Sequence, residues 1–145
     1  MIKSVRHTGI VVEDLEKMSD FYIALGFTNF SKAVEEGEFI DKVTGLIKTK
    51  LEWIKLKSPD GYLLELLKYH SHPDSNYIAT NANAYDMGCS HLAYTVDNIE
   101  IARQKIIDAG GSVGDSPALS SNGKFKVAYC HDPEGVIIEI VEEVR

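Results

Sequence analysis

The chain has 145 residues, and 15 Lys and Arg against 22 Asp and Glu give it a formal net charge of −7. This length fits one domain, and a composition of 44% hydrophobic and 26% charged residues is typical of a globular protein, which excludes a disordered or fibrous chain. The acidic balance disfavours nucleic acids and anionic membranes as partners, because both attract clustered Lys and Arg. We therefore expect the partner to be a small molecule or another protein.

The sequence also lacks the features of a membrane or secreted protein. No segment approaches the roughly 18 uninterrupted apolar residues of a spanning helix. The first residues, MIKSVRH, have no apolar core like that of a signal peptide. We therefore expect a cytoplasmic protein with no membrane partner.

The first half of the chain predicts a strand, a helix and further strands. An alternating β-branched run predicts a strand over 5–12, and an acidic cap is expected to open the helix that follows. Apolar residues then recur at helical spacing and are followed by Gly26; they are Leu15, Met18, Phe21, Tyr22 and Leu25. The strand predicted over 51–56 is joined by a Pro-Asp-Gly turn to an apolar strand over 62–67.

The second half repeats this order. A strand is predicted over 91–96, and Asp97 with Glu100 three residues later has the pattern of a capping box at a helix start. The apolar stripe of that helix precedes Gly110 and consists of Ile99, Ala102 and Ile106. A strand over 126–130 and a Pro-Glu-Gly turn then lead to an apolar strand over 136–141.

The two halves align with each other. His7 lies 84 residues before His91, and Glu65 lies 74 residues before Glu139, so the first half is ten residues longer, which we assign to the region 35–49. The sequence therefore predicts an α+β fold of two tandem βαβββ modules within a single domain, residues 1–145. We expect module one over about 1–70, a linker over about 71–88 and module two over about 89–145.

Four polar residues occupy equivalent places in the two modules. Glu65 and Glu139 each lie inside an otherwise apolar strand, where an unpaired carboxylate is costly unless it finds a partner or a metal. His7 and His91 lie on the matching first strands. If a twofold axis relates the modules, these side chains converge as two imidazoles and two carboxylates, a set suited to Zn, Ni, Co, Fe or Mn. In the alternative, each His and Glu only share a buried hydrogen bond.

Three segments carry a resemblance to a known family: 7–16 (HTGIVVEDLE), 90–96 (SHLAYTV) and 132–139 (DPEGVIIE). They resemble the vicinal oxygen chelate superfamily, which includes glyoxalase I, methylmalonyl-CoA epimerase, extradiol dioxygenases, and fosfomycin and bleomycin resistance proteins. The resemblance covers essentially the whole chain. It implies paired modules that form a cup-shaped mixed β-sheet around a divalent metal, with ligands within one chain or across a homodimer. The ligands implied are His7, Glu65, His91 and Glu139.

This ligand set is similar to that of the glyoxalase and epimerase branches. The resemblance implies a metal-dependent lyase or isomerase of the glyoxalase I type, which moves a proton next to a carbonyl through a metal-stabilised enediolate. Glu139 would act as the base with Glu65 as its counterpart, and Zn, Ni or Co is the expected metal, with Fe or Mn as further candidates. Three other functions remain open: an epimerase of the methylmalonyl-CoA or cyclitol and sugar type, a non-catalytic ligand-binding or resistance protein, and an Fe(II) dioxygenase.

Two positions bear on glutathione as a cosubstrate. Glutathione-dependent glyoxalases of the bacterial type have an Arg four residues after the first ligand, where this chain has Val11. They have an Asn shortly after the second ligand, where this chain has Lys68 and Tyr69. We therefore expect a lactoylglutathione lyase-like enzyme without strict dependence on glutathione.

Overall fold

The computed structural model describes residues 1–73, 84–85, 87–89 and 91–144. The chain divides into two compact units, Met1–Tyr77 and Ile78–Arg145, and each unit has its own β-sheet. The linker predicted over about 71–88 lies mostly outside the described residues. In the described part of the chain, no helix is long and apolar enough to cross a membrane.

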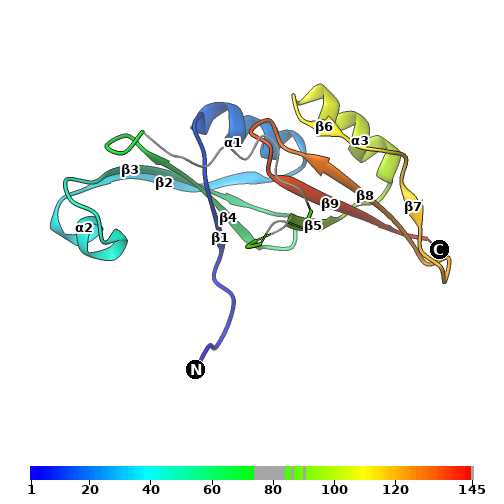
Figure 1. Ribbon diagram of the computed structural model, residues 1–145, viewed down its shortest axis with the longest axis horizontal. Helices are drawn as coiled ribbons and strands as arrows, with labels where there is room; N and C mark the ends of the chain where they lie inside the picture. Colours follow the sequence, from blue (N-terminus) through cyan, green and yellow to red (C-terminus); the bar gives the residue numbers. More distant parts are fainter. Residues whose placement is uncertain (74–83, 86, 90, 145) are drawn as a thin grey trace. The chain divides into compact units, whose positions relative to one another are not determined.

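The first unit is a four-stranded sheet with α1 on one face (Figure 1). Its elements are β1 (Thr8–Val11), α1 (Leu15–Ala24), β2 (Thr28–Glu36), α2 (Glu38–Thr44), β3 (Lys50–Lys57) and β4 (Leu63–Tyr69). The strand order is β1-β4-β3-β2, in which β1 runs parallel to β4 and the other neighbours are antiparallel. The short helix α2 lies in the region 35–49, where the alignment of the two halves places the extra residues.

The second unit repeats this topology. Its elements are β5 (His91–Thr95), α3 (Ile99–Asp108), β6 (Ser112–Val113), β7 (Ala118–Leu119), β8 (Phe125–His131) and β9 (Ile137–Glu143). The strand order is β5-β9-β8-β6, β7 pairs with β8, and β5 runs parallel to β9. The predicted α+β fold of two tandem βαβββ modules is therefore confirmed.

Helices α1 and α3 each pack on one face of the sheet of their own unit. In the first unit, the buried apolar side chains of α1 and of the strands beneath it include Leu15, Met18, Phe21, Tyr22, Leu56, Leu64 and Leu66. In the second unit, those of α3 and its sheet include Ile99, Ile106, Cys130, Ile138 and Ile140. Burying each such large side chain stabilises the fold by about 1.5–3 kcal/mol. In each unit, we call the sheet face that is not covered by the helix, α1 or α3, the far face.

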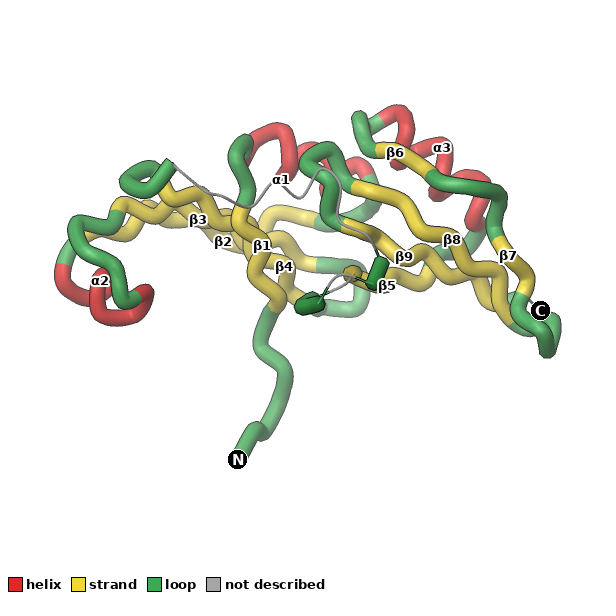
Figure 2. The backbone as a smooth tube through the Cα atoms, in the orientation of Figure 1, coloured by secondary structure: helices red, strands yellow, loops and turns green. Residues whose placement is uncertain are grey.

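Two local predictions differ from the structure. The first strand begins at Thr8 and not at residue 5, because the residues before it form a loop (Figure 2), so His7 lies immediately before β1. Helix α3 is capped by Asn98 and not by Asp97: the Asn98 side chain accepts a hydrogen bond of 2.9 Å from the backbone N–H of Ile101. The capping-box prediction is therefore wrong, since an Asn98 cap places Ile101 at the position that a capping box gives to Glu or Gln.

Candidate active site

The first unit holds His7 and Glu65 in contact. Nε2 of His7 lies 3.0 Å from Oε2 of Glu65. Glu65 lies in the middle of β4 and pairs in register with Gly9, two residues after His7. Because side chains alternate along a strand, Glu65 points to the far face, away from its buried neighbours Leu64 and Leu66. Glu65 is only 9% exposed, so its carboxylate depends on the partners that this face provides.

The second unit holds His91 and Glu139 in the same way. Nε2 of His91 lies 2.7 Å from Oε2 of Glu139. Glu139 lies in β9 and pairs in register with Ala93, two residues after His91. The hydroxyl of Tyr129 is 3.4 Å from Nδ1 of the same histidine. This second pair is also on the far face of its sheet, because Ile138 and Ile140, which flank Glu139 in β9, are buried on the α3 side.

The four predicted ligands thus form two equivalent pairs, one in each unit. In both pairs the glutamate is on the last strand, and the histidine belongs to the first strand or immediately precedes it. Within the described residues of either unit, no third His, Cys, Asp or Glu joins its pair to form a metal-binding group. Each unit by itself therefore supplies two candidate ligands.

Two further residues lie at these pairs, and neither belongs to the predicted ligand set. Lys55 of β3 places its Nζ 3.2 Å from Oε1 of Glu65. Tyr129 of β8 takes the equivalent position in the second unit, since each residue pairs in register with the glutamate of its unit. Both stand ten residues before that glutamate, and this shared spacing is the signal that could have found them. By composition, Lys55 is one of several lysines typical of a solvated strand, so its identity alone does not mark it.

Comparison with known proteins identifies the family of this fold. Residues 4–140 match the model of the Glyoxalase/Bleomycin resistance protein/Dioxygenase superfamily. The chain belongs to this superfamily. The match covers both units, so the family resemblance of the three sequence segments is confirmed.

Individual relatives in the superfamily are similar along nearly their whole length. A probable lactoylglutathione lyase from Synechocystis sp. is 29% identical over 138 residues, covering 94% of this chain and 92% of the relative. The lactoylglutathione lyase of Escherichia coli O157:H7 is 26% identical over 143 residues, covering 94% of this chain and 90% of the relative. The crystal structure of a glyoxalase family protein from Bacillus cereus superposes with a TM-score of 0.93 at 25% identity, covering all of this chain and 97% of that one.

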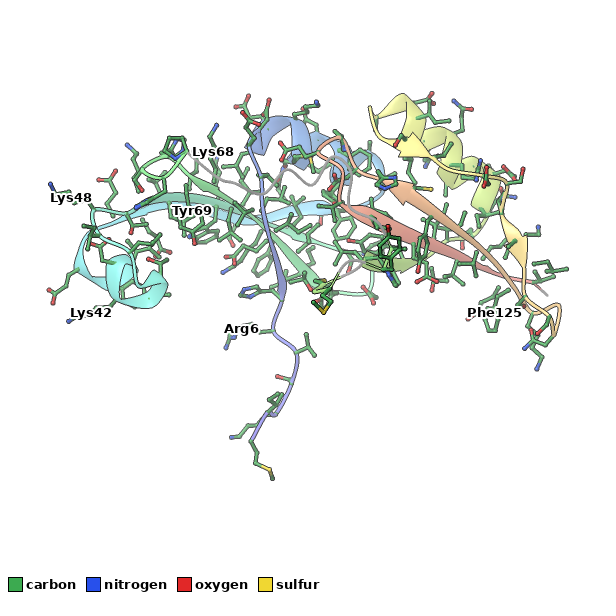
Figure 3. The ribbon with its side chains drawn as sticks, in the orientation of Figure 1. Arg6, Lys42, Lys48, Lys68, Tyr69 and Phe125 are labelled. Atoms are coloured by element: carbon green, nitrogen blue, oxygen red, sulfur yellow. The ribbon has the colours of Figure 1, made fainter. Side chains whose placement is uncertain are left out.

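Of the positions compared with glutathione-dependent glyoxalases, the one on β1 is not a basic residue. Val11 is 60% exposed and pairs in register with Leu67, on the same face as Glu65. Lys68 and Tyr69 point to opposite sides of β4 (Figure 3), because they are adjacent in the strand. Tyr69 therefore shares the far face with Glu65, and Lys68 does not.

The two pairs have donor types that bind divalent metals, since imidazole nitrogen and carboxylate oxygen are common ligands of zinc and related ions. The His–Glu separations of 3.0 and 2.7 Å are those of a hydrogen bond between the two groups. Nδ1 of His7 is buried without a hydrogen-bond partner in the described residues.

Proposed function

We propose that this chain is a metal-dependent lyase or isomerase of the glyoxalase type, which moves a proton next to a carbonyl group of a small-molecule substrate. The observation that carries the proposal is the His–Glu pair repeated at the same place in both modules. A single such pair is an ordinary buried hydrogen bond, but nothing in folding requires the same pair in both modules. The relatives named lactoylglutathione lyase support this reaction class.

The proposed metal ligands are His7, Glu65, His91 and Glu139. Either pair offers two donors, whereas catalytic zinc sites have at least three protein ligands, so one pair alone does not complete such a site. Members of this superfamily generally use a divalent metal. Two imidazoles and two carboxylates, without a thiolate, suit Zn, Ni or Co, with Fe and Mn as weaker candidates.

In the proposed reaction, Glu139 transfers the proton. A divalent metal, when bound, supplies a Lewis acid that polarises the substrate carbonyl and stabilises the negative charge developing on its oxygen. Glu139 removes a proton from the adjacent carbon, with Glu65 as its counterpart. Return of the proton to the neighbouring carbon gives isomerisation, and return to the opposite face of the same carbon gives epimerisation. A positioned base contributes about 10²- to 10⁴-fold in rate, or about 3–5 kcal/mol.

A second candidate, an epimerase of the methylmalonyl-CoA or cyclitol type, is favoured by one observation. Val11 takes the place on β1 where a glutathione-dependent glyoxalase of the bacterial type is expected to have an arginine. A substrate held by other contacts would then replace the glutathione adduct. Both candidates share the same ligands and the same base, and they differ in the substrate and in the carbon that receives the proton.

Solvent deuterium exchange tests both candidates together. The protein is stripped with a chelator, reloaded with Zn, Ni or Co, and incubated in D₂O with methylglyoxal hemithioacetal, an acyl-CoA thioester or a keto-sugar. We expect metal-dependent deuterium incorporation into one substrate, lost in Glu139→Gln and kept in Glu143→Gln, which changes an exposed carboxylate of the same strand.

Each other outcome would redirect the assignment. Full exchange by Glu139→Gln would refute the role of Glu139 as the base. Ligand binding without exchange in any substrate would indicate a binding or resistance protein. Oxygen consumption with a catechol and Fe(II) would indicate a dioxygenase.

A further inference from the structure

The two modules differ in residue type at one equivalent position of the far face. Glu65 and Glu139 each pair in register with a residue of the next strand, Lys55 in the first unit and Tyr129 in the second. Lys55 contacts the glutamate of its unit, through Nζ and Oε1 at 3.2 Å. Tyr129 instead contacts the histidine of its unit, with its ring centroid 5.1 Å from that of His91. The two carboxylates that look equivalent in the sequence therefore have different neighbours.

Lys55 is held in place by more than the ion pair. Its Nζ lies 4.3 Å from the centroid of the Trp53 ring, a distance within the range of a cation–π contact. Trp53 in turn donates a 2.8 Å hydrogen bond from Nε1 to Oε1 of Glu35 on β2. The Lys55 side chain is 24% exposed, whereas that of Lys50 at the start of the same strand is 53% exposed. This chain of contacts orients the ammonium group toward Glu65.

The ion pair divides the two oxygens of Glu65 between two partners. Oε1 faces Lys55, and Oε2 faces Nε2 of His7. Rotation of this carboxylate away from the site would leave a partly buried ammonium group unpaired, which is costly. In the described part of the second unit, no Lys or Arg forms an ion pair with Glu139, whose recorded ion-pair partner is His91. Movement of Glu139 therefore breaks no ion pair with a lysine or arginine there.

We propose that Lys55 is a positioning residue that fixes the orientation of Glu65 as a metal ligand, which leaves Glu139 as the carboxylate able to move and carry the proton. This inference rests on the proposed metal site and adds to it the reason why the two glutamates differ. Lys55 acts through Glu65 and is not itself one of the proposed ligands. Groups that orient a metal ligand from outside typically affect metal affinity by about 10- to 100-fold.

The test measures zinc affinity in the absence of any substrate, by competition with a chromophoric chelator. We expect Lys55→Met to raise the Kd for Zn²⁺ about tenfold or more, and Lys55→Arg, which keeps a charged donor, to restore most of the affinity. Lys57→Met is the matched control, because Lys57 is exposed on the same strand and face; we expect its Kd to match the wild type. Urea unfolding of each variant checks that it folds.

A double-mutant cycle separates positioning from a general structural effect. In the Glu65→Gln background, Lys55→Met should change the Kd for Zn²⁺ by less than about twofold, since the carboxylate that Lys55 positions is gone. An equal loss in both backgrounds would overturn the inference, as would unchanged or tighter zinc binding by Lys55→Met alone. Those results would leave the proposed function standing. A wild-type protein that binds no divalent metal would overturn the proposed function and this inference with it.

Discussion

The turn before β9 offers a test of how the strand carrying Glu139 is held. Asp132 is 3% exposed, and its Oδ1 accepts hydrogen bonds from the backbone N–H groups of Glu134 at 3.0 Å and Val136 at 2.9 Å. Asp132→Ala removes this acceptor and leaves two amides of the turn without it. We expect the turn to loosen and the free energy of unfolding to fall.

The size of the loss follows from these two hydrogen bonds. A hydrogen bond to a charged group contributes about 1.5–3 kcal/mol, and water reaching the partly buried amides recovers some of this. We therefore expect Asp132→Ala to lower the free energy of unfolding by about 2–4 kcal/mol. For a chain of this length the melting temperature should fall by about 6–12 °C. Urea unfolding followed by circular dichroism measures the change.

Two variants serve as controls for this prediction. Asp132→Asn keeps an acceptor oxygen without the charge and should lose about half as much stability as Asp132→Ala. Ser58 is the residue 74 positions earlier, in the equivalent turn of the first unit, where its hydroxyl donates to the exposed carboxylate of Asp60 and lies 3.2 Å from the carbonyl oxygen of Tyr62. Ser58→Ala should cost only about 0.5–1.5 kcal/mol. A loss for Asp132→Ala no larger than that of Ser58→Ala would refute the reasoning.

Three further predictions use single contacts. A Cβ at Gly9 would lie 3.0 Å from Cδ1 of Leu67 and 4.0 Å from Oε2 of Glu65. Gly9→Val should therefore destabilise the protein by about 1–3 kcal/mol and weaken zinc binding, whereas Gly9→Ala should have little effect on either. Urea unfolding and zinc titration measure the two effects. The backbone N–H of Ile99 donates to Glu142 and holds the pKa of that carboxyl below its usual value. The resulting stability is present above the unfolded pKa and is lost as pH falls through the lower folded pKa, so the urea midpoint should drop more between about pH 5 and 3 in the wild type than in Glu142→Gln; parallel curves would contradict this. Asn98→Ala should cost about 1 kcal/mol as a lost helix cap, and Asp97→Ala should cost less in the same assay; the reverse order would restore the capping-box prediction.

The sequence singled out the four residues of the two pairs but not everything that surrounds them. His7 with Glu65 and His91 with Glu139 could be found because both pairs recur at matching positions of the repeat, and because a carboxylate in an apolar strand needs a partner. The contact of Lys55 with Glu65 could not be predicted because it depends on register: β3 must align with β4 so that position 55 lies opposite Glu65. A lysine between Ile54 and Leu56 has no local feature that distinguishes an ion pair from a solvated side chain.

Some features of the helices and strands could likewise be predicted from the sequence, and others only from the folded chain. Helical spacing of apolar residues and the turn residues before each last strand act locally, so the sequence by itself determined the order of the βαβββ modules and the place of α1 and α3. The start of β1 depends on its pairing with β4, whose register begins at Thr8 opposite Leu64, so only the tertiary structure decided that Thr8 opens the strand. Residues far apart in sequence meet through strand pairing, and for that reason the contact of Lys55 with Glu65, and of Tyr129 with His91, came only from the folded chain.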